Sequence, residues 1–261
     1  MFAGKLNDDK ESRSSMMAGR AALRLVAMAA VAVLAACDGV TGERFGQQLE
    51  PYRYRLTAIV DTPKGERRGS SVIEVQWSEP GTIMGTQGSA GHTVKGEAVA
   101  VDLADGQTLF VLLRSPANPD WAAWALRDVI PNLKDATGAD RAVHPLPRQY
   151  RQISETVDNY PYMVRFRDPA DPQSVEQVDP ADLAKSFGPG IRLKSLTVQV
   201  TDDMLTLGIE ERLGWLEAVG RQRATLIKRP QRNKGEGLPL LLDAKPIQLI
   251  SPSDFSTELY K

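Results

Sequence analysis

The chain has 261 residues, of which 42% are hydrophobic and 25% are charged, and its formal net charge is -1. These values are typical of a globular protein with one large domain or two small ones, and they show no basic excess that would indicate nucleic-acid binding. With 2 histidines and 1 cysteine, the chain cannot form an internal disulfide and has too few ligands for the usual structural zinc sites. We therefore predict no cofactor and no metal.

The first element in chain order is a targeting segment. Arg20 and Arg24 precede an apolar stretch, residues 25–36. This stretch of about 12 residues is shorter than the roughly 20 that span a bilayer, and its length and flanks are typical of a secretory signal peptide. Because the pattern begins near Met16 and Met17, either residue is an alternative translation start.

The targeting segment closes with Leu34, Ala35, Ala36 and Cys37. This order resembles the lipobox of bacterial lipoproteins. The resemblance implies that residues 1–36 are a signal peptide cleaved between Ala36 and Cys37, and that diacylglycerol is attached to the Cys37 thiol. In such lipoproteins the new terminus is often acylated as well, and palmitate is an expected acyl group. Two or more acyl chains would make membrane anchoring stable. The alternatives are an ordinary signal peptide and a core helix with a buried free cysteine.

The residues after Cys37 bear on location. Asp38 follows the cysteine directly, and an aspartate there resembles the signal that retains enterobacterial lipoproteins in the inner membrane. We therefore expect a lipid anchor facing the periplasm, with the inner membrane favoured. Residues 37–50 are polar and contain three glycines, which predicts a flexible tether.

The body is predicted to be a single α+β domain over residues 51–250, followed by a C-terminal tail over 251–261. We expect mainly antiparallel β-sheet built from hairpins, with two or three short helices. Residues 52–60 and 71–77 alternate around a turn at 62–65, which predicts a β-hairpin. A second hairpin is predicted from strands at 94–103 and 108–114 around an Asp-Gly turn.

Further strands and helices are predicted along the rest of the body. Residues 109–113 are continuously apolar, which predicts a central strand covered on both faces. Further strands are expected at 162–166, 191–200, 223–228 and 238–249, and helices after Asn118-Pro119-Asp120, from Asp179-Pro180 to Gly188, and over 209–219. Residues 81–91 are predicted to be a loop, and Trp77, Trp121, Trp124 and Trp215 to be core residues.

Motifs for nucleophilic catalysis are absent from the sequence. Around Ser89 the first glycine of a Gly-x-Ser-x-Gly elbow is misplaced, and no Ser-x-x-Lys occurs. The Gly-rich loop before His92 lacks the spacing and the lysine of a phosphate-binding loop. His92 and His144 stay candidates for a general base, because triads assemble in space rather than in sequence; the alternative is a histidine without a chemical role.

Two groups of polar residues are candidates for a site. Carboxylates are numerous, and a pair of them flanking a sugar bond would suffice for a glycosidase, but a chain this charged supplies such pairs by chance, and capping and solvation are the favoured explanation. The members singled out are Glu74, Glu97, Asp102, Asp158, Asp168, Asp171, Asp202, Asp203, Glu210 and Glu211. Tyrosines and arginines also cluster at 148–167, where ring faces and guanidinium groups can bind sugars, peptides or anions. The predicted binding surface is Tyr150, Tyr160, Tyr162, Arg165 and Arg167, with plain packing at a sheet margin as the alternative.

The body, especially residues 52–77 and 192–215, resembles exported proteins of Gram-negative bacteria that have no assigned activity, so the resemblance transfers no site. The function predicted from the sequence is a membrane-anchored envelope lipoprotein with a non-enzymatic binding or structural role. Its expected partners are the membrane, through lipid on Cys37, and an envelope protein or polymer. The alternative is a periplasmic hydrolase that acts on an envelope polymer.

Overall fold

The computed structural model describes residues 46–83, 86–103, 106–130, 139–152, 155–221 and 250–259, together with Leu133 and Leu226. Cys37 and the lipobox lie outside the described residues, as do the strand predicted at 238–249 and all but one residue of that at 223–228. The chain divides into two compact units, one of residues 1–47 with 79–90 and one of residues 48–78 with 91–261. In the first unit, β3 (Thr82–Ile83) pairs antiparallel with β4 (Thr86–Gln87), so the predicted loop contains a minimal hairpin.

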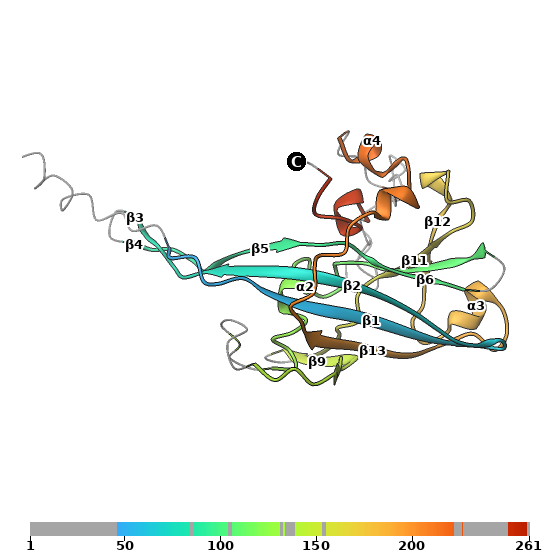
Figure 1. Cartoon of the computed structure of the whole chain (residues 1–261), viewed down its shortest axis with the longest axis horizontal. Coiled ribbons are helices and arrows are strands. Elements are labelled where there is room, and N and C mark those ends of the chain that lie inside the picture. Colours follow the sequence, from blue (N-terminus) through green and yellow to red (C-terminus); the bar gives the residue numbers. More distant parts are fainter. Residues whose placement is uncertain are drawn as a thin grey trace, which may run out of the picture. The chain divides into compact units, whose positions relative to one another are not determined.

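The second unit holds a five-stranded antiparallel sheet in the order β5-β2-β1-β13-β8 (Figure 1). The strands are β1 (Tyr52–Thr62), β2 (Gly65–Ser78), β5 (Gly91–Lys95), β8 (His144–Pro145) and β13 (Arg192–Val200). Tyr54 of β1 lies opposite Ile73 of β2 and Val200 of β13. The first predicted hairpin and the predicted strand at 191–200 are thus confirmed.

A four-stranded antiparallel sheet has the order β12-β11-β7-β6. Its strands are β6 (Val99–Asp102), β7 (Thr108–Val111), β11 (Met163–Phe166) and β12 (Val175–Val178). Leu109 and Val111 point into one core cluster, whereas Phe110 and Leu112 point into another. The prediction that this segment is central and covered on both faces is therefore confirmed.

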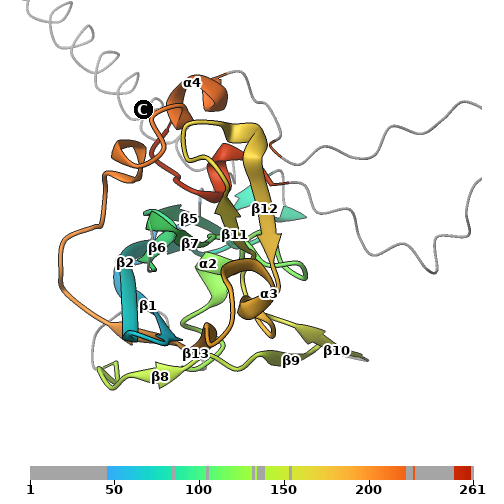
Figure 2. The same cartoon turned by 90° about the vertical axis from the view of Figure 1, so that its right-hand side faces the viewer.

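Short elements complete the unit (Figure 2). They are α2 (Trp121–Trp124), α3 (Leu183–Phe187), α4 (Leu216–Arg221), the 3-10 turns η3 (Pro172–Ser174), η4 (Ile209–Glu211) and η5 (Pro252–Asp254), and the two-stranded pair β9 (Gln149–Gln152) and β10 (Glu155–Asp158). Antiparallel sheet with short helices confirms the predicted α+β class.

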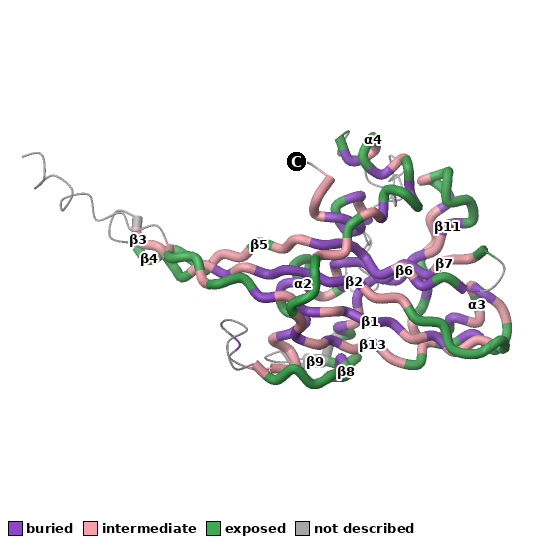
Figure 3. Tube along the Cα trace, viewed as in Figure 1, coloured by how far each residue is buried: buried purple, intermediate pink, exposed green. Residues whose placement is uncertain are grey.

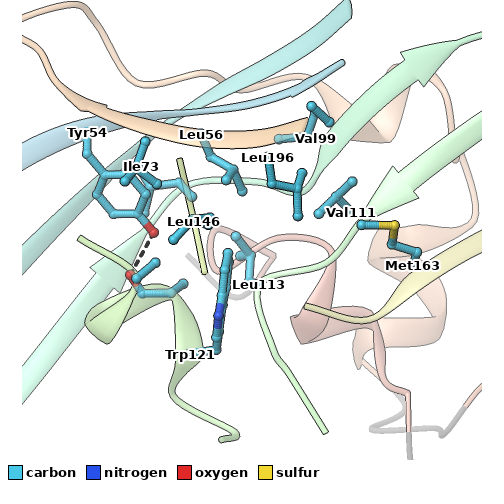
Figure 4. Packing of buried hydrophobic residues seen from close by; sticks show 14 of the residues in the cluster. Tyr54, Leu56, Ile73, Val99, Val111, Leu113, Trp121, Leu146, Met163 and Leu196 are labelled. Atoms are coloured by element: carbon cyan, nitrogen blue, oxygen red, sulfur yellow. Dashed lines mark hydrogen bonds between the residues drawn. The ribbon is translucent and has the colours of Figure 1, made fainter. Parts of the chain in front are cut away.

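Two hydrophobic clusters hold these layers together, and buried residues run along both sheets (Figure 3). The first lies between the sheets and includes α2 and α3; Figure 4 shows Tyr54, Leu56, Ile73, Val111, Trp121 and Leu196 packed within it. There the Tyr54 hydroxyl donates a hydrogen bond of 2.7 Å to the carbonyl of Ala122. The second cluster covers the other face of the four-stranded sheet with η4, α4 and η5, and Phe255 is fully buried in it.

Three predicted elements are wrong in detail. The strand predicted at 94–103 is broken at Gly96, whose φ of 144° is open to glycine but not to other residues, so β5 and β6 belong to different sheets. The helix predicted at 209–219 is divided into η4 and α4 around Gly214. The helix predicted from Asp179 begins at Leu183, because the side chain of Asp182 accepts the capping hydrogen bond from the Lys185 amide.

One of the tryptophans predicted to be core residues, Trp124, is instead exposed. Trp77 and Trp121 are buried and Trp215 is half-buried, but Trp124 is 39% exposed. In α2, residues 121, 122 and 123 face the core, which directs Trp124 outward. Its ring meets Trp77 edge-on at a centroid distance of 4.9 Å.

Candidate functional site

The candidate site is a cleft where the ends of β11 and β12 meet α3 and the base of the β9–β10 pair. It has a volume of about 640 Å³. Its lining contains two cationic side chains, two carboxylates, two tyrosines and an amide. We call it the Tyr160 cleft, and its lining residues are Pro116, Arg148, Asp158, Tyr160, Pro161, Tyr162, Met163, Gln177, Val178, Asp179, Pro180 and Lys185.

One wall of the cleft is organised by Asp158. Its Oδ1 accepts a hydrogen bond of 3.1 Å from the Tyr160 amide, and its Oδ2 accepts 3.2 and 3.3 Å bonds from the Arg148 guanidinium. The guanidinium carbon of Arg148 lies 5.9 Å from the centre of the Tyr160 ring, within cation–π range. The carboxylate therefore positions a guanidinium and an aromatic face side by side.

The two tyrosines of the cleft are neutral hydrogen-bond donors at neutral pH. Burial raises the pKa of Tyr160, an effect that nearby Arg148 opposes and Asp158 reinforces. Burial also raises the pKa of Tyr162, against the effect of Arg114. Tyr160 is half-buried and keeps part of its surface in the cleft, whereas Tyr162 is buried.

The opposite wall supplies a free cation. Asp179 is engaged, because its Oδ1 accepts a 2.8 Å bond from the Ala181 amide. Lys185 of α3 is exposed, and no described carboxylate forms an ion pair with it. Asp158 is bonded to Arg148 and Tyr160, so the groups of the cleft that can contact an anionic or polar ligand are the Lys185 ammonium, the Arg148–Tyr160 pair and the Gln177 amide.

The structure brings together only part of the predicted tyrosine–arginine surface. Tyr160 and Tyr162 line the cleft, and Arg165 and Arg167 do not. Both arginines pair with Glu176 on β12, at 2.7 and 2.9 Å, and Arg165 also lies 5.6 Å from the Phe187 ring centre. Tyr150 lies in β9, opposite Val157.

Sequence reasoning did not single out Lys185 and Gln177 as site residues. Each is an isolated polar residue on a short element, and neither belongs to a motif. The helix predicted from Asp179-Pro180 to Gly188 included Lys185. Only the fold brings Lys185 into the same cleft as Tyr160, which lies 25 positions earlier in the sequence.

The two histidines lie in different parts of the second unit. His144 is on β8, and its Nε2 is 3.2 Å from Asp140. His92 is on β5 and lines a smaller cavity of about 280 Å³, where its Nε2 is 3.7 Å from Asp120 Oδ1. That distance exceeds hydrogen-bond length. In the same cavity the Ser253 hydroxyl is hydrogen-bonded to Ser251, and the Thr257 hydroxyl is hydrogen-bonded to Gly96.

The predicted carboxylates are mostly engaged in structural contacts. Asp202 forms two bonds with Arg141, of 2.6 and 3.0 Å, and Asp203 pairs with Arg55. The remaining pairs are Glu74 with Arg53 and Lys95, and Asp102 with Arg212. Asp168 and Asp171 cap turns, Glu97 is buried, and Glu210 and Glu211 lie in η4. Within the described part of the chain, no three His, Cys, Asp or Glu side chains are grouped to hold a metal ion.

A comparison of the chain with known protein families, curated proteins and solved structures gives no match. Among the helices that the structure describes, none is long and apolar enough to cross a membrane.

Proposed function

We propose that this protein is a lipid-anchored lipoprotein of the bacterial envelope, whose body binds another envelope component through the Tyr160 cleft. The proposal for the anchor is supported by the order Leu34-Ala35-Ala36-Cys37 after an apolar stretch, and by Cys37 being the one cysteine of the chain. Acyl chains on that thiol would hold the protein to the membrane, with the inner membrane favoured by Asp38.

The proposal for binding is carried by one observation: Asp158 of the Tyr160 cleft is paired with Arg148, while Lys185 has no carboxylate partner among the described residues. The Lys185 ammonium is therefore the point at which a negatively charged group would bind. The Arg148–Tyr160 pair adds a flat surface on which a peptide or sugar can stack. The ligand that fits best is a polar segment of an envelope protein or polymer that presents a carboxylate.

A periplasmic hydrolase is the alternative, and it is less well supported by this geometry. The Tyr160 cleft is lined by no histidine, serine, threonine or cysteine among the described residues. In the His92 cavity, the imidazole and the hydroxyl groups do not form a nucleophile–base pair. Binding without chemistry is therefore the function proposed.

Site-specific photo-crosslinking tests the binding role directly. A photoreactive amino acid at Gln177, in the full-length lipoprotein expressed in its own bacterium, should give a discrete crosslinked product. Lys185→Glu reverses the charge of the unpaired cation and should reduce the product at least about tenfold, the effect of losing one charge-assisted contact.

A photoreactive residue placed outside the cleft is the matched control for this experiment. Glu211 is exposed on η4, in the second unit but not in the lining of the cleft. The same photoreactive residue at Glu211 should not give the Gln177 product. Identical products from both positions, or a Gln177 product that persists undiminished in Lys185→Glu, would refute the cleft as the binding site.

A further inference from the structure

A second cavity, about 280 Å³ in volume, lies among β5, α2 and the C-terminal turn η5. We call it the His92 cavity; its lining is His92, Val94, Leu113, Pro119, Asp120, Ala122, Ser253, Asp254 and Thr257. The three segments are distant in sequence, and Leu113 bridges two of them: its amide donates a 2.9 Å bond to the Asp254 carbonyl of η5, and its carbonyl accepts a 3.2 Å bond from the Ala122 amide of α2. The cavity is thus a feature of the folded unit and is independent of the Tyr160 cleft.

The described lining of this cavity is acidic. It contains the carboxylates of Asp120 and Asp254 and no lysine or arginine side chain. Val94, Leu113, Pro119 and Ala122 supply the apolar part of the wall. A cation on a short hydrocarbon stem matches both parts of this surface, whereas an anion would meet two like charges.

Asp254 is the more buried of the two acids, with 7% of its surface exposed. Its Oδ2 accepts bonds of 2.8 and 3.2 Å from the Ser251 amide and hydroxyl. No described residue donates to its Oδ1. Burial raises the pKa of Asp254, while the hydrogen bonds from Ser251 and the positive charge of Arg114 oppose that rise. Arg114 acts on the carboxylate by its charge and not through a hydrogen bond. A cation bound in the cavity would stabilise the carboxylate by direct contact.

His92 and Asp120 both line the cavity and are separated by a gap. The 3.7 Å between His92 Nε2 and Asp120 Oδ1 is too long for a direct hydrogen bond. The His92 ring is fixed from behind, because it packs against Trp77 at a centroid distance of 5.0 Å. A group with several donors could bond to both residues at once.

We propose that the His92 cavity binds a compact primary ammonium group on a short aliphatic stem. An ammonium carries three donors and no acceptor, so it can bond to both His92 Nε2 and Asp120 Oδ1, which lie 3.7 Å apart, while Asp254 adds a second carboxylate to the cavity wall. The stem packs against Val94, Leu113 and Ala122. A multidentate cation such as calcium is a poorer match, because the described carboxylates and histidines form no group suited to a metal.

The test is an NMR titration of the full-length lipoprotein in detergent micelles with 1,4-diaminobutane, with 1,4-butanediol as the neutral counterpart. The diamine should shift the backbone amide signals of His92 and Ala122 saturably, and the diol should not. Asp120→Asn should weaken diamine binding about tenfold, since it removes one charged acceptor. Asp120 is exposed and makes no side-chain cap to α2, so this variant should fold.

Asp140→Asn is the matched control, because Asp140 is also an exposed aspartate beside a histidine, but it lies outside the cavity lining. Its affinity for the diamine should stay within about twofold of that of the unchanged protein, a smaller change than the loss of one charged contact would cause. Equal shifts from diamine and diol, the absence of a saturable shift, or equal weakening by Asp120→Asn and Asp140→Asn would each overturn the proposal. None of these outcomes bears on crosslinking at the Tyr160 cleft.

Discussion

At the residue scale, the buried carboxylate of Glu97 connects segments that are distant in sequence. Glu97 is 2% exposed. Its Oε2 accepts a 2.9 Å bond from the Ile209 amide, and its Oε1 accepts a 3.4 Å bond from the Ser256 hydroxyl. The sequence marked Glu97 only as one acid among many, because its partners lie 112 and 159 positions away and no local pattern reports them.

Glu97 should make stability depend on pH. Burial raises its pKa above the ordinary value of 4.5, against the effect of the bonds from Ile209 and Gly208. A raised pKa means that the folded state binds the proton more tightly than the unfolded state, so this contribution to stability is present at low pH and is lost as the pH rises through the folded pKa.

Glu97→Gln keeps a hydrogen-bond acceptor and removes the titration. Relative to the unchanged protein, the free energy of unfolding of the variant should therefore increase between pH 4 and pH 7, by on the order of 1 kcal/mol. Urea unfolding at several pH values measures it, with Glu211→Gln as an exposed control. A stability difference that stays constant or falls over this range would show that burial does not govern Glu97.

At the element scale, β2 approaches β6 closely because Gly69 has no side chain. A Cβ atom at Gly69 would lie 2.1 Å from the carbonyl oxygen of Ala100. A backbone carbonyl cannot move aside as a flexible side chain can, so the glycine sets how closely the two sheets pack. The strand predicted from the sequence, 71–77, does not include Gly69, and the pattern gave no sign of this contact.

Gly69→Ala should destabilise the body by about 3 kcal/mol or more, because the added methyl group forces two backbones apart. Arg68→Ala is the control on the neighbouring exposed position and should change stability by less than about 0.5 kcal/mol. Thermal and urea unfolding of both variants measure this. Equal stability of the two variants would mean that β2 and β6 are not in this close contact.

The strands that the sequence predicted correctly are those with a clear pattern of apolar residues. Alternation identified β1, β2 and β13, although residues 71–75 of β2 are buried on both faces, and an unbroken apolar run identified β7. Alternation could not show that the chain changes sheets at Gly96, because that break depends on a positive φ. β12 was missed because its residues, Val175–Val178, carry two polar side chains at a sheet edge.

At the scale of the second unit, both sheets contribute to one core, and a second core covers the far face of the four-stranded sheet (Figure 2). This arrangement brings residues 148–162 together with 177–185 to form the Tyr160 cleft. The sequence could name Tyr160 and Tyr162 from local clustering. It could not separate them from Arg165 and Arg167, which both pair with Glu176 on the neighbouring strand.

At the scale of the whole protein, the proposed envelope role depends on lipid attached to Cys37. The most direct test is mass spectrometry of the intact protein and of its N-terminal peptide, purified from the bacterium that produces it, with Cys37→Ser as the control. We predict a chain that begins at Cys37 and carries a diacylglyceryl thioether and an amide-linked acyl chain. An uncleaved chain with an unmodified Cys37 thiol would contradict the proposed anchor.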